Sequence, residues 1–267
     1  MVEPSQSSPA RKRRIRRLLL VCTLLVLTLL GAAVAFLLLW QKEKTPQPKS
    51  LTIPEGRRAS QVYDAIDQAV GAAPGTAMKA AATTELALPA ASEGNPEGFL
   101  FPATYPVKDT TTASSLLAYM VRTANERFGT GPAVHRDVVV ASIVQAEADT
   151  AADMGKVARV IENRLARGMP LQMDSTLNYA LNRSTLDTTH EDTRLDSPYN
   201  TYARKGLPPT PIGNPGLEAM RAVRNPTPGN WLYFVTVKPG DTRFTDDYEV
   251  QKQNVKEFNA NRRSAGG

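Results

Sequence analysis

The chain has 267 residues, of which 42% are hydrophobic, so it can fold a core in one or two domains. Its formal charge is +6, but six of the 32 basic residues and only one of the 26 acidic residues fall within residues 1–40. The remainder has 26 basic and 25 acidic residues, a net charge of +1, which argues against a basic face for nucleic acid. Cys22 is the single cysteine, so an intramolecular disulfide is excluded.

The N-terminal region predicts a membrane anchor. The stretch 18–40 carries no charge and is long enough to cross a bilayer with some tilt. Six basic residues lie just before it, within 11–17, and the positive-inside rule places them in the cytoplasm. We therefore expect a cytoplasmic tail at 1–17, a transmembrane helix at 18–40, a linker at 41–50 and an extracytoplasmic body in the cell membrane.

The next region, 51–96, predicts a small element. Residues 51–53 favour a strand, and a helix capped by Ser60 follows, with Val62, Ile66 and Val70 on one face. Residues 72–95 show little periodicity and are expected to be a loose connection or a weak helix. The aromatic-rich stretch 97–105 has two interpretations: a strand or tight turn covering the core, or a wall of a ligand groove.

Later segments alternate between helices and short extended pieces, which indicates an α+β fold. Helices are predicted at 112–128, 155–168, 217–223 and 247–263, and a buried strand at 231–237. Arg164 projects from the apolar face of its helix, so it needs a partner. Residues 169–176 read as a turn or short strand that carries Gln172 and Asp174.

The stretch 137–149 holds the candidate catalytic residue. On a helix, Val140, Ile143, Val144 and Glu147 share one face, which places the Glu147 carboxylate at the end of a buried stripe. Loss of water there raises the pKa of a carboxyl group, and this keeps an acid protonated near neutral pH. The alternative is a glutamate that turns outward into solvent at the helix end.

Two loops, 197–202 and 206–216, are dense in Pro, Gly, Asn and Tyr. Tyr faces stack on sugar rings and Asn serves hydroxyl groups as donor and acceptor, although both stretches could equally be structural surface loops. The two histidines lie in no metal-ligand pattern, and neither a G-x-S-x-G motif nor a glycine-rich phosphate loop is present. What remains is carboxylate chemistry with polar and aromatic loops, which suits carbohydrate cleavage.

A series of motifs in order supports a resemblance. They are TIPEG (52–56), EGFLFPATY (97–105), SIVQAEA (142–148), NRLARGMPLQMDST (163–176), SPYNTY (197–202), GLPPTPIGNPG (206–216) and WLYFV (231–235). Together they resemble the endolytic murein transglycosylases of the MltG/YceG-like family. The match covers roughly residues 50–260.

The resemblance implies an activity and an organisation. Such enzymes cut the MurNAc-β-1,4-GlcNAc bond of peptidoglycan strands and leave 1,6-anhydroMurNAc ends, without a cofactor or metal. It further implies a reduced LysM-like region at 51–96, a catalytic domain at 97–263, and peptidoglycan synthases (penicillin-binding proteins) as membrane partners. Glu147 matches the catalytic position, whereas Gln145 replaces the first acidic residue of that motif, and the C-terminal segment lacks the family's frequent histidines.

Five residues are candidates to hold the sugar or to orient Glu147. They are Gln172, Asp174, Tyr199, Asn200 and Tyr202. The competing hypothesis is a membrane-tethered protein that binds glycan or scaffolds a synthase without turnover.

Overall fold

The computed structural model describes residues 23–37, 49–183 and 188–265, and the chain divides into two compact units, 1–48 and 49–267. In the first unit, residues 23–37 form an exposed helix. Among the residues described, no helix combines the length and apolar character that a membrane crossing requires. The expected tail, both ends of the expected span 18–40 and most of the expected linker lie outside the described residues.

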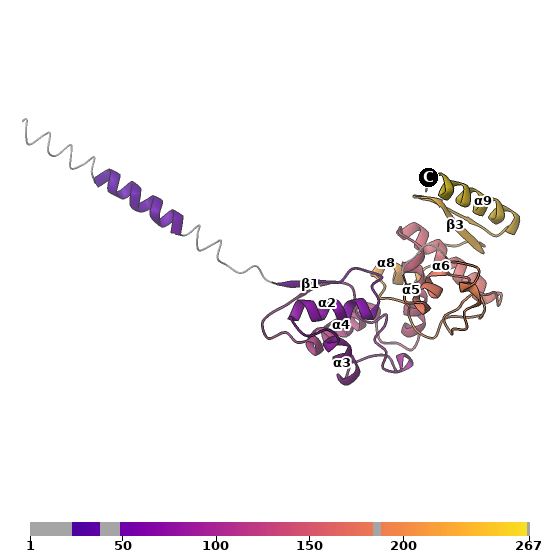
Figure 1. The fold of residues 1–267 in the computed structure, drawn as a ribbon, viewed down its shortest axis with the longest axis horizontal. Helices are drawn as coiled ribbons and strands as arrows, with labels where there is room; N and C mark the ends of the chain where they lie inside the picture. The colour runs from indigo at the N-terminus through magenta and orange to yellow at the C-terminus, as the bar shows by residue number, and fades with distance from the viewer. Residues whose placement is uncertain (1–22, 38–48, 184–187, 266–267) are drawn as a thin grey trace, which may run out of the picture. The chain divides into compact units, whose positions relative to one another are not determined.

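The second unit is a mixed α+β structure, as the sequence predicts, and begins with a small sheet and three helices (Figure 1). Strand β1 (Ser50–Thr52) pairs antiparallel with β2 (Thr104–Pro106), so that Leu51 lies opposite Tyr105. Helices α2 (Ala59–Val70), α3 (Thr76–Thr83) and α4 (Ala113–Phe128) pack against one another. The two strands lie on either side of the expected domain boundary at 96/97, within one compact unit.

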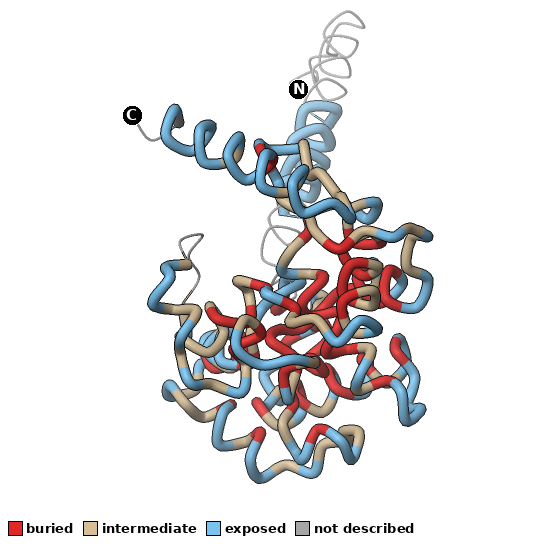
Figure 2. The backbone as a smooth tube through the Cα atoms, turned by 90° about the vertical axis from the view of Figure 1, so that its right-hand side faces the viewer, coloured by how far each residue is buried: buried red, intermediate tan, exposed pale blue. Residues whose placement is uncertain are grey.

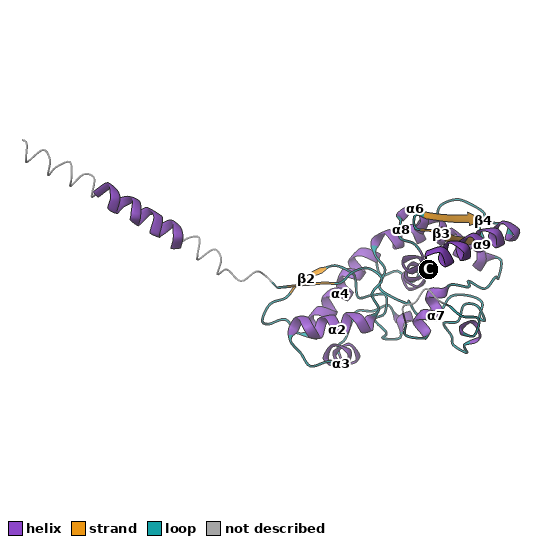
Figure 3. Cartoon of the chain, turned by 45° about the horizontal axis from the view of Figure 1, so that its top comes forward, coloured by secondary structure: helices purple, strands orange, loops and turns teal. Residues whose placement is uncertain are grey.

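A second helical group carries the middle of the chain. Helices α5 (Val134–Glu147), α6 (Ala151–Ala166) and α8 (Leu217–Arg224) contact one another pairwise. The short helix α7 (Asp174–Ala180) contacts α5 and is flanked by loops (Figure 3). Two single turns of 3-10 helix, Ala90–Ser92 and Asp192–Arg194, interrupt the connections.

The C-terminal part is a β-hairpin with a helix against it. Strands β3 (Tyr233–Lys238) and β4 (Asp241–Thr245) pair antiparallel, and α9 (Tyr248–Ala265) packs mainly on β3. The strand expected at 231–237 therefore exists but is not buried as predicted: most of its residues are half-buried. A two-stranded sheet has no neighbouring strands to enclose it, which explains the difference.

Side-chain caps begin two of the helices. Thr112 and Thr150 cap α4 and α6 by accepting hydrogen bonds from Ser115 N and Asp153 N. The predicted cap at Ser60 is wrong, because α2 begins at Ala59 and the Arg58 amide donates to the side chain of Gln61. Of the two alternatives for 72–95, the weak helix is present as α3 at Thr76–Thr83, and the expected turn or strand at 169–176 becomes helical at Asp174.

The core runs through both helical groups, and α9 stays mostly exposed (Figure 2). Phe99, Leu100 and Phe101 are buried, and the Tyr105 hydroxyl donates to the Phe101 carbonyl at 2.5 Å. The stretch 97–105 therefore covers the core, the first of its two interpretations. Gly98 is required there: its φ is +87°, and a Cβ would lie 2.6 Å from both Pro211 and Val138.

Candidate active site

Glu147 is the last residue of α5. Val140, Ile143 and Val144 on the same helix are fully buried, which confirms the predicted apolar stripe. The chain leaves the helix at Ala148, and Glu147 itself is half-buried. The carboxyl group therefore lies at the margin of the core, half-buried at the end of an apolar stripe.

Helix α7 supplies the hydrogen bonds to this carboxyl group. The Ser175 hydroxyl donates to Glu147 Oε1 at 2.6 Å and the Ser175 amide donates to the same oxygen at 3.3 Å. Burial raises the pKa of Glu147, against the two Ser175 bonds that lower it, and the neighbouring Asp174 raises it further. The net upward direction favours a protonated acid.

Asp174 and Tyr202 complete the immediate surroundings of Glu147. The Tyr202 hydroxyl donates to Asp174 Oδ1 at 2.5 Å. Burial, followed by this bond and the nearby carboxylates, raises the pKa of Tyr202 well above its ordinary value. Tyr202 therefore remains a hydrogen-bond donor at neutral pH and holds Asp174 beside Glu147.

Buried Arg164 anchors the segment that leads to α7. It donates to the carbonyl oxygens of Leu171 and Leu232, both at 2.6 Å, and its guanidinium lies 5.3 Å from the Tyr233 ring centre. This gives Arg164 the partners that the sequence requires of it. It also donates to Gln172 Oε1 at 3.3 Å; Gln172 is exposed and takes a positive φ of 51°.

The other two candidate residues lie differently. The half-buried Tyr199 packs its ring 4.9 Å from that of Tyr179, and its hydroxyl is 2.8 Å from Thr210 Oγ1. Asn200 is fully buried: its amide group donates to the carbonyls of Thr193 and Leu195, and its oxygen accepts two backbone amides. The structure thus brings Asp174 and Tyr202 close to Glu147, whereas Gln172 contacts Arg164 and Asn200 bonds inside its own loop.

Two contributors were not singled out from the sequence. Ser175 is the direct partner of Glu147, and Tyr179, one turn later on α7, donates to Glu97 Oε2 at 3.1 Å. The spacing of Ser175 and Tyr179 places both on one face of a helix, which was the available signal. The prediction of a turn or short strand at 169–176 does not use this helical spacing.

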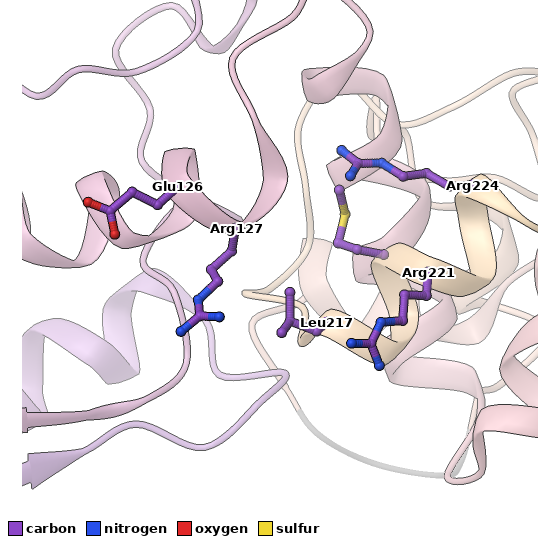
Figure 4. A pocket seen from close by; sticks show the side chains of 6 residues that line it. Glu126, Arg127, Leu217, Arg221 and Arg224 are labelled. Carbon is purple, nitrogen blue, oxygen red and sulfur yellow. The ribbon is translucent and has the colours of Figure 1, made fainter.

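A separate polar hollow of about 360 Å³ lies between the end of α4 and α8 (Figure 4). Its lining residues are Glu126, Arg127, Leu217, Met220, Arg221 and Arg224. Arg221 pairs with Glu218, and Arg224 pairs with Asp137 at 3.4 Å, so two of its three arginines already have acidic partners. Glu147, Asp174, Ser175 and Tyr202 do not line this hollow. Within residues 23–37, 49–183 and 188–265, no three His, Cys, Asp or Glu side chains form a metal-ligand cluster.

Fold and site together define a mixed α+β protein with one desolvated carboxylic acid at a helix end, beside a loop bearing tyrosines. The model of the YceG-like family matches residues 31–257. The chain belongs to the YceG-like family.

Relatives extend this assignment. The chain is 37% identical over 158 residues to the endolytic murein transglycosylase of Bacillus subtilis (strain 168), a match that covers 56% of the chain and 44% of that protein. It is 37% identical over 175 residues to the endolytic murein transglycosylase of Streptococcus pneumoniae serotype 2 (strain D39 / NCTC 7466), covering 60% of the chain and 32% of that protein. The chain thus spans less than half the length of both relatives.

A solved structure shares the fold. The crystal structure of a YceG-like protein from Listeria monocytogenes superposes with a TM-score of 0.68 and is 31% identical. The comparison covers 80% of this chain and 78% of that one. Most of this chain therefore shares its fold with the Listeria protein.

Proposed function

We propose that this protein is an endolytic lytic transglycosylase that cleaves the MurNAc-β-1,4-GlcNAc bond of peptidoglycan and leaves 1,6-anhydroMurNAc ends. The observation that carries the proposal is the half-buried Glu147, whose pKa is raised by burial and whose Oε1 is held by Ser175. The names of the Bacillus and Streptococcus relatives support the same activity.

The chemistry uses one carboxyl group twice. Protonated Glu147 gives its proton to the glycosidic oxygen as the bond to the muramoyl C1 breaks, and GlcNAc leaves as an alcohol. The muramoyl 6-hydroxyl then bonds to C1, and the Glu147 carboxylate takes its proton. Because the nucleophile belongs to the substrate, no second carboxylate is needed to place a water molecule, and the internal attack gains from proximity.

The surrounding residues take supporting roles in this proposal. Asp174, held by Tyr202, favours the protonated state of Glu147 and accepts hydrogen bonds from sugar hydroxyls. Gln172 is exposed two residues before Asp174 in the chain and can bind the glycan, and Tyr199 offers a ring face on the loop 197–202. Asn200 acts on the sugar indirectly, by fixing the loop 197–202 from inside.

The location of the reaction is part of the proposal. Residues 18–40 anchor the chain in the cell membrane as a single pass with the N-terminus in the cytoplasm, because a cluster of six basic residues at 11–17 directly precedes the apolar stretch, whereas the charges just after it are mixed. Residues 51–96 act as a reduced LysM-like region ahead of the catalytic part. In this position the protein acts on nascent strands beside peptidoglycan synthases and terminates them.

A matched pair of variants tests the assignment. Glu147→Gln preserves size and hydrogen bonding and removes the proton donor, whereas Glu126→Gln makes the same change on the exposed side of α4. We expect Glu147→Gln to lower strand cleavage by about 10²–10⁴-fold, the usual contribution of a general acid and base. Glu126→Gln should retain wild-type activity. The measurement is mass spectrometry of anhydro ends released from purified peptidoglycan.

Three outcomes would contradict the proposal in different ways. Full activity of Glu147→Gln would remove Glu147 from the reaction. Reducing ends in place of anhydro ends would show that water is the nucleophile. Binding without any cleavage by the wild-type protein would favour the tethered glycan-binding or scaffolding hypothesis.

A further inference from the structure

Glu97 is a buried carboxylate that the proposed chemistry does not use. Its side chain is 3% exposed. Oε1 accepts from the Ala59 amide at 2.9 Å and from Asn214 Nδ2 at 3.3 Å, and Oε2 accepts from the Tyr179 hydroxyl at 3.1 Å. One carboxylate thus joins the start of α2, the loop 206–216 and helix α7.

Arg58 reinforces the same junction from the N-terminal side. Its guanidinium lies 5.2 Å from the Tyr179 ring centre, and it donates to the Arg183 carbonyl at 2.7 Å and to Asn182 Oδ1 at 3.4 Å. Both contacts reach the chain just after α7. Glu97 and Arg58 therefore fix the C-terminal end of the helix whose first turn holds Glu147.

Helix α7 is short enough to transmit this constraint. It has seven residues, with Ser175 in its first turn and Tyr179 one turn later. A rigid turn links the two positions, so a shift of Tyr179 moves the Ser175 hydroxyl that donates to Glu147. A misplacement of about 1 Å in a catalytic group can lower a rate by about 10²-fold.

We propose that Glu97 is a positioning residue: its ionised carboxylate holds α7 through Tyr179 in the place where Ser175 orients Glu147. The proposal rests on the proposed function for its effect on catalysis, but the coupling of Glu97 to α7 can be measured without any reaction.

The ionisation state of Glu97 is set by the groups around it. Burial raises its pKa to about 7, although the hydrogen bonds from Ala59, Tyr179 and Gly98 and the charge of Arg58 lower it. Tyr63 on α2 also faces it, and the pKa of Tyr63 rises to about 12, by burial first and by Glu97 second. Protonation of Glu97 at Oε2 would turn that acceptor into a donor, so the bond with the Tyr179 hydroxyl would reverse direction and lose its ionised acceptor.

The two carboxyl groups, Glu97 and Glu147, set the direction of the pH effect. Activity requires ionised Glu97 and protonated Glu147, so it should rise with pH through the Glu97 pKa near 7 and fall again above the Glu147 pKa. A glutamine at position 97 mimics the protonated state, because its amide nitrogen donates where the carboxylate accepted. Glu97→Gln should therefore remove the acidic limb of the profile.

The test compares Glu97→Gln and Tyr179→Phe with Glu85→Gln, which removes an exposed carboxylate. We expect kcat to fall about tenfold in the first two variants with little change in KM, because substrate contacts remain and the acid is misplaced. Tyr179→Phe keeps the ring and leaves Glu97 in place, so it tests the coupling even if Glu97→Gln fails to fold. Glu85→Gln should match the wild type.

Amide hydrogen exchange supplies the measurement that is independent of turnover. At pH 8, amides of α7 should exchange about tenfold faster in Glu97→Gln than in Glu85→Gln, whereas α4 amides should be unchanged. At pH 5.5 the difference should shrink, because wild-type Glu97 is then protonated. Equal α7 exchange and equal kcat in both variants would overturn the inference. If α7 exchange is altered in Glu97→Gln but Glu147→Gln remains active, the proposed function alone would be overturned.

Discussion

Opposing influences act on the Glu147 carboxyl group. Burial and Asp174 raise its pKa, and the two hydrogen bonds from Ser175 lower it. The Ser175 hydroxyl lies 2.6 Å from Oε1, close enough for a strong bond to an ionised acceptor. Ser175 therefore both orients the acid and limits how far its pKa can rise.

Ser175→Ala should separate these two roles. Without the hydroxyl, the ionised form of Glu147 loses a stabilising bond and its pKa rises. A hydrogen bond to a charged group contributes about 1.5 kcal/mol, which corresponds to a shift of about one pH unit. Because Glu147 must be protonated to act, the alkaline limb of the activity profile should move to higher pH by about that amount. The measurement is the pH dependence of kcat.

Ser264→Ala on the exposed part of α9 is a suitable control, because it also removes a serine hydroxyl from a helix. Its pH profile should coincide with that of the wild type. An alkaline limb that stays in place or moves to lower pH in Ser175→Ala would contradict the assigned sign.

At the residue scale, the sequence predicts the position of Glu147 at the end of an apolar stripe but not Ser175 as its hydrogen-bond partner. The apolar stripe in α5 is local, so periodicity alone places Glu147 at its end. Ser175 lies 28 residues further along the chain, and only the approach of α7 to α5 brings it within reach. Asn200 is the opposite case. The loop composition predicts that its side chain binds a sugar, whereas the structure shows its amide group bonded to the backbone inside the loop.

The connection between elements depends on Asn214 in the loop 206–216. It is fully buried; its Oδ1 accepts from the Leu100 amide at 2.7 Å, and its Nδ2 donates to the Arg57 carbonyl at 2.8 Å and to Glu97. Its backbone also exchanges hydrogen bonds with Gly56 and Arg57. One side chain therefore joins the turn before α2, the stretch 97–105 and the loop that faces Tyr199.

Asn214→Ala should be strongly destabilising. It leaves the buried Leu100 amide without its partner, at a cost of about 1–3 kcal/mol, and it removes the side-chain bonds to the Arg57 carbonyl and to Glu97. We expect the free energy of unfolding to fall by more than about 2 kcal/mol, measured by denaturant titration. Asn259→Ala, at an exposed position of α9, should change it by less than about 0.5 kcal/mol. A similar small change for Asn214→Ala would contradict the connecting role.

Elements with a strong local signal were predictable. The apolar faces of α4 and α6 predict both helices, although α6 begins four residues earlier than expected, just after the Thr150 cap. Helix α7 and the exposure of β3 were not predictable, because both depend on contacts with other segments of the chain. Gln172 turns the chain with a positive φ just before α7, and β3 has only one partner strand.

At the scale of the whole molecule, residues 49–267 behave as one compact unit. Leu51, Ile53, Val62 and Ile66 belong to the same buried core as α5 and α6. The α+β class followed from the mixture of patterns along the chain. The sequence does not predict that 51–96 is integrated with the remainder, because β1 pairs with β2 about fifty residues later in the chain.

This integration predicts how the chain tolerates truncation. A fragment 49–267 should fold and unfold cooperatively, because it contains the complete core, both partners of the β1–β2 sheet and the Ala59 amide that binds Glu97. A fragment 97–267 should not reach the native state, since it exposes the apolar face under α2 and leaves the buried Glu97 carboxylate without the Ala59 donor. Circular dichroism with thermal unfolding and limited proteolysis distinguish the two fragments. A protease-resistant, cooperatively unfolding 97–267 fragment would show that 51–96 is a separate domain resting on an independent catalytic core.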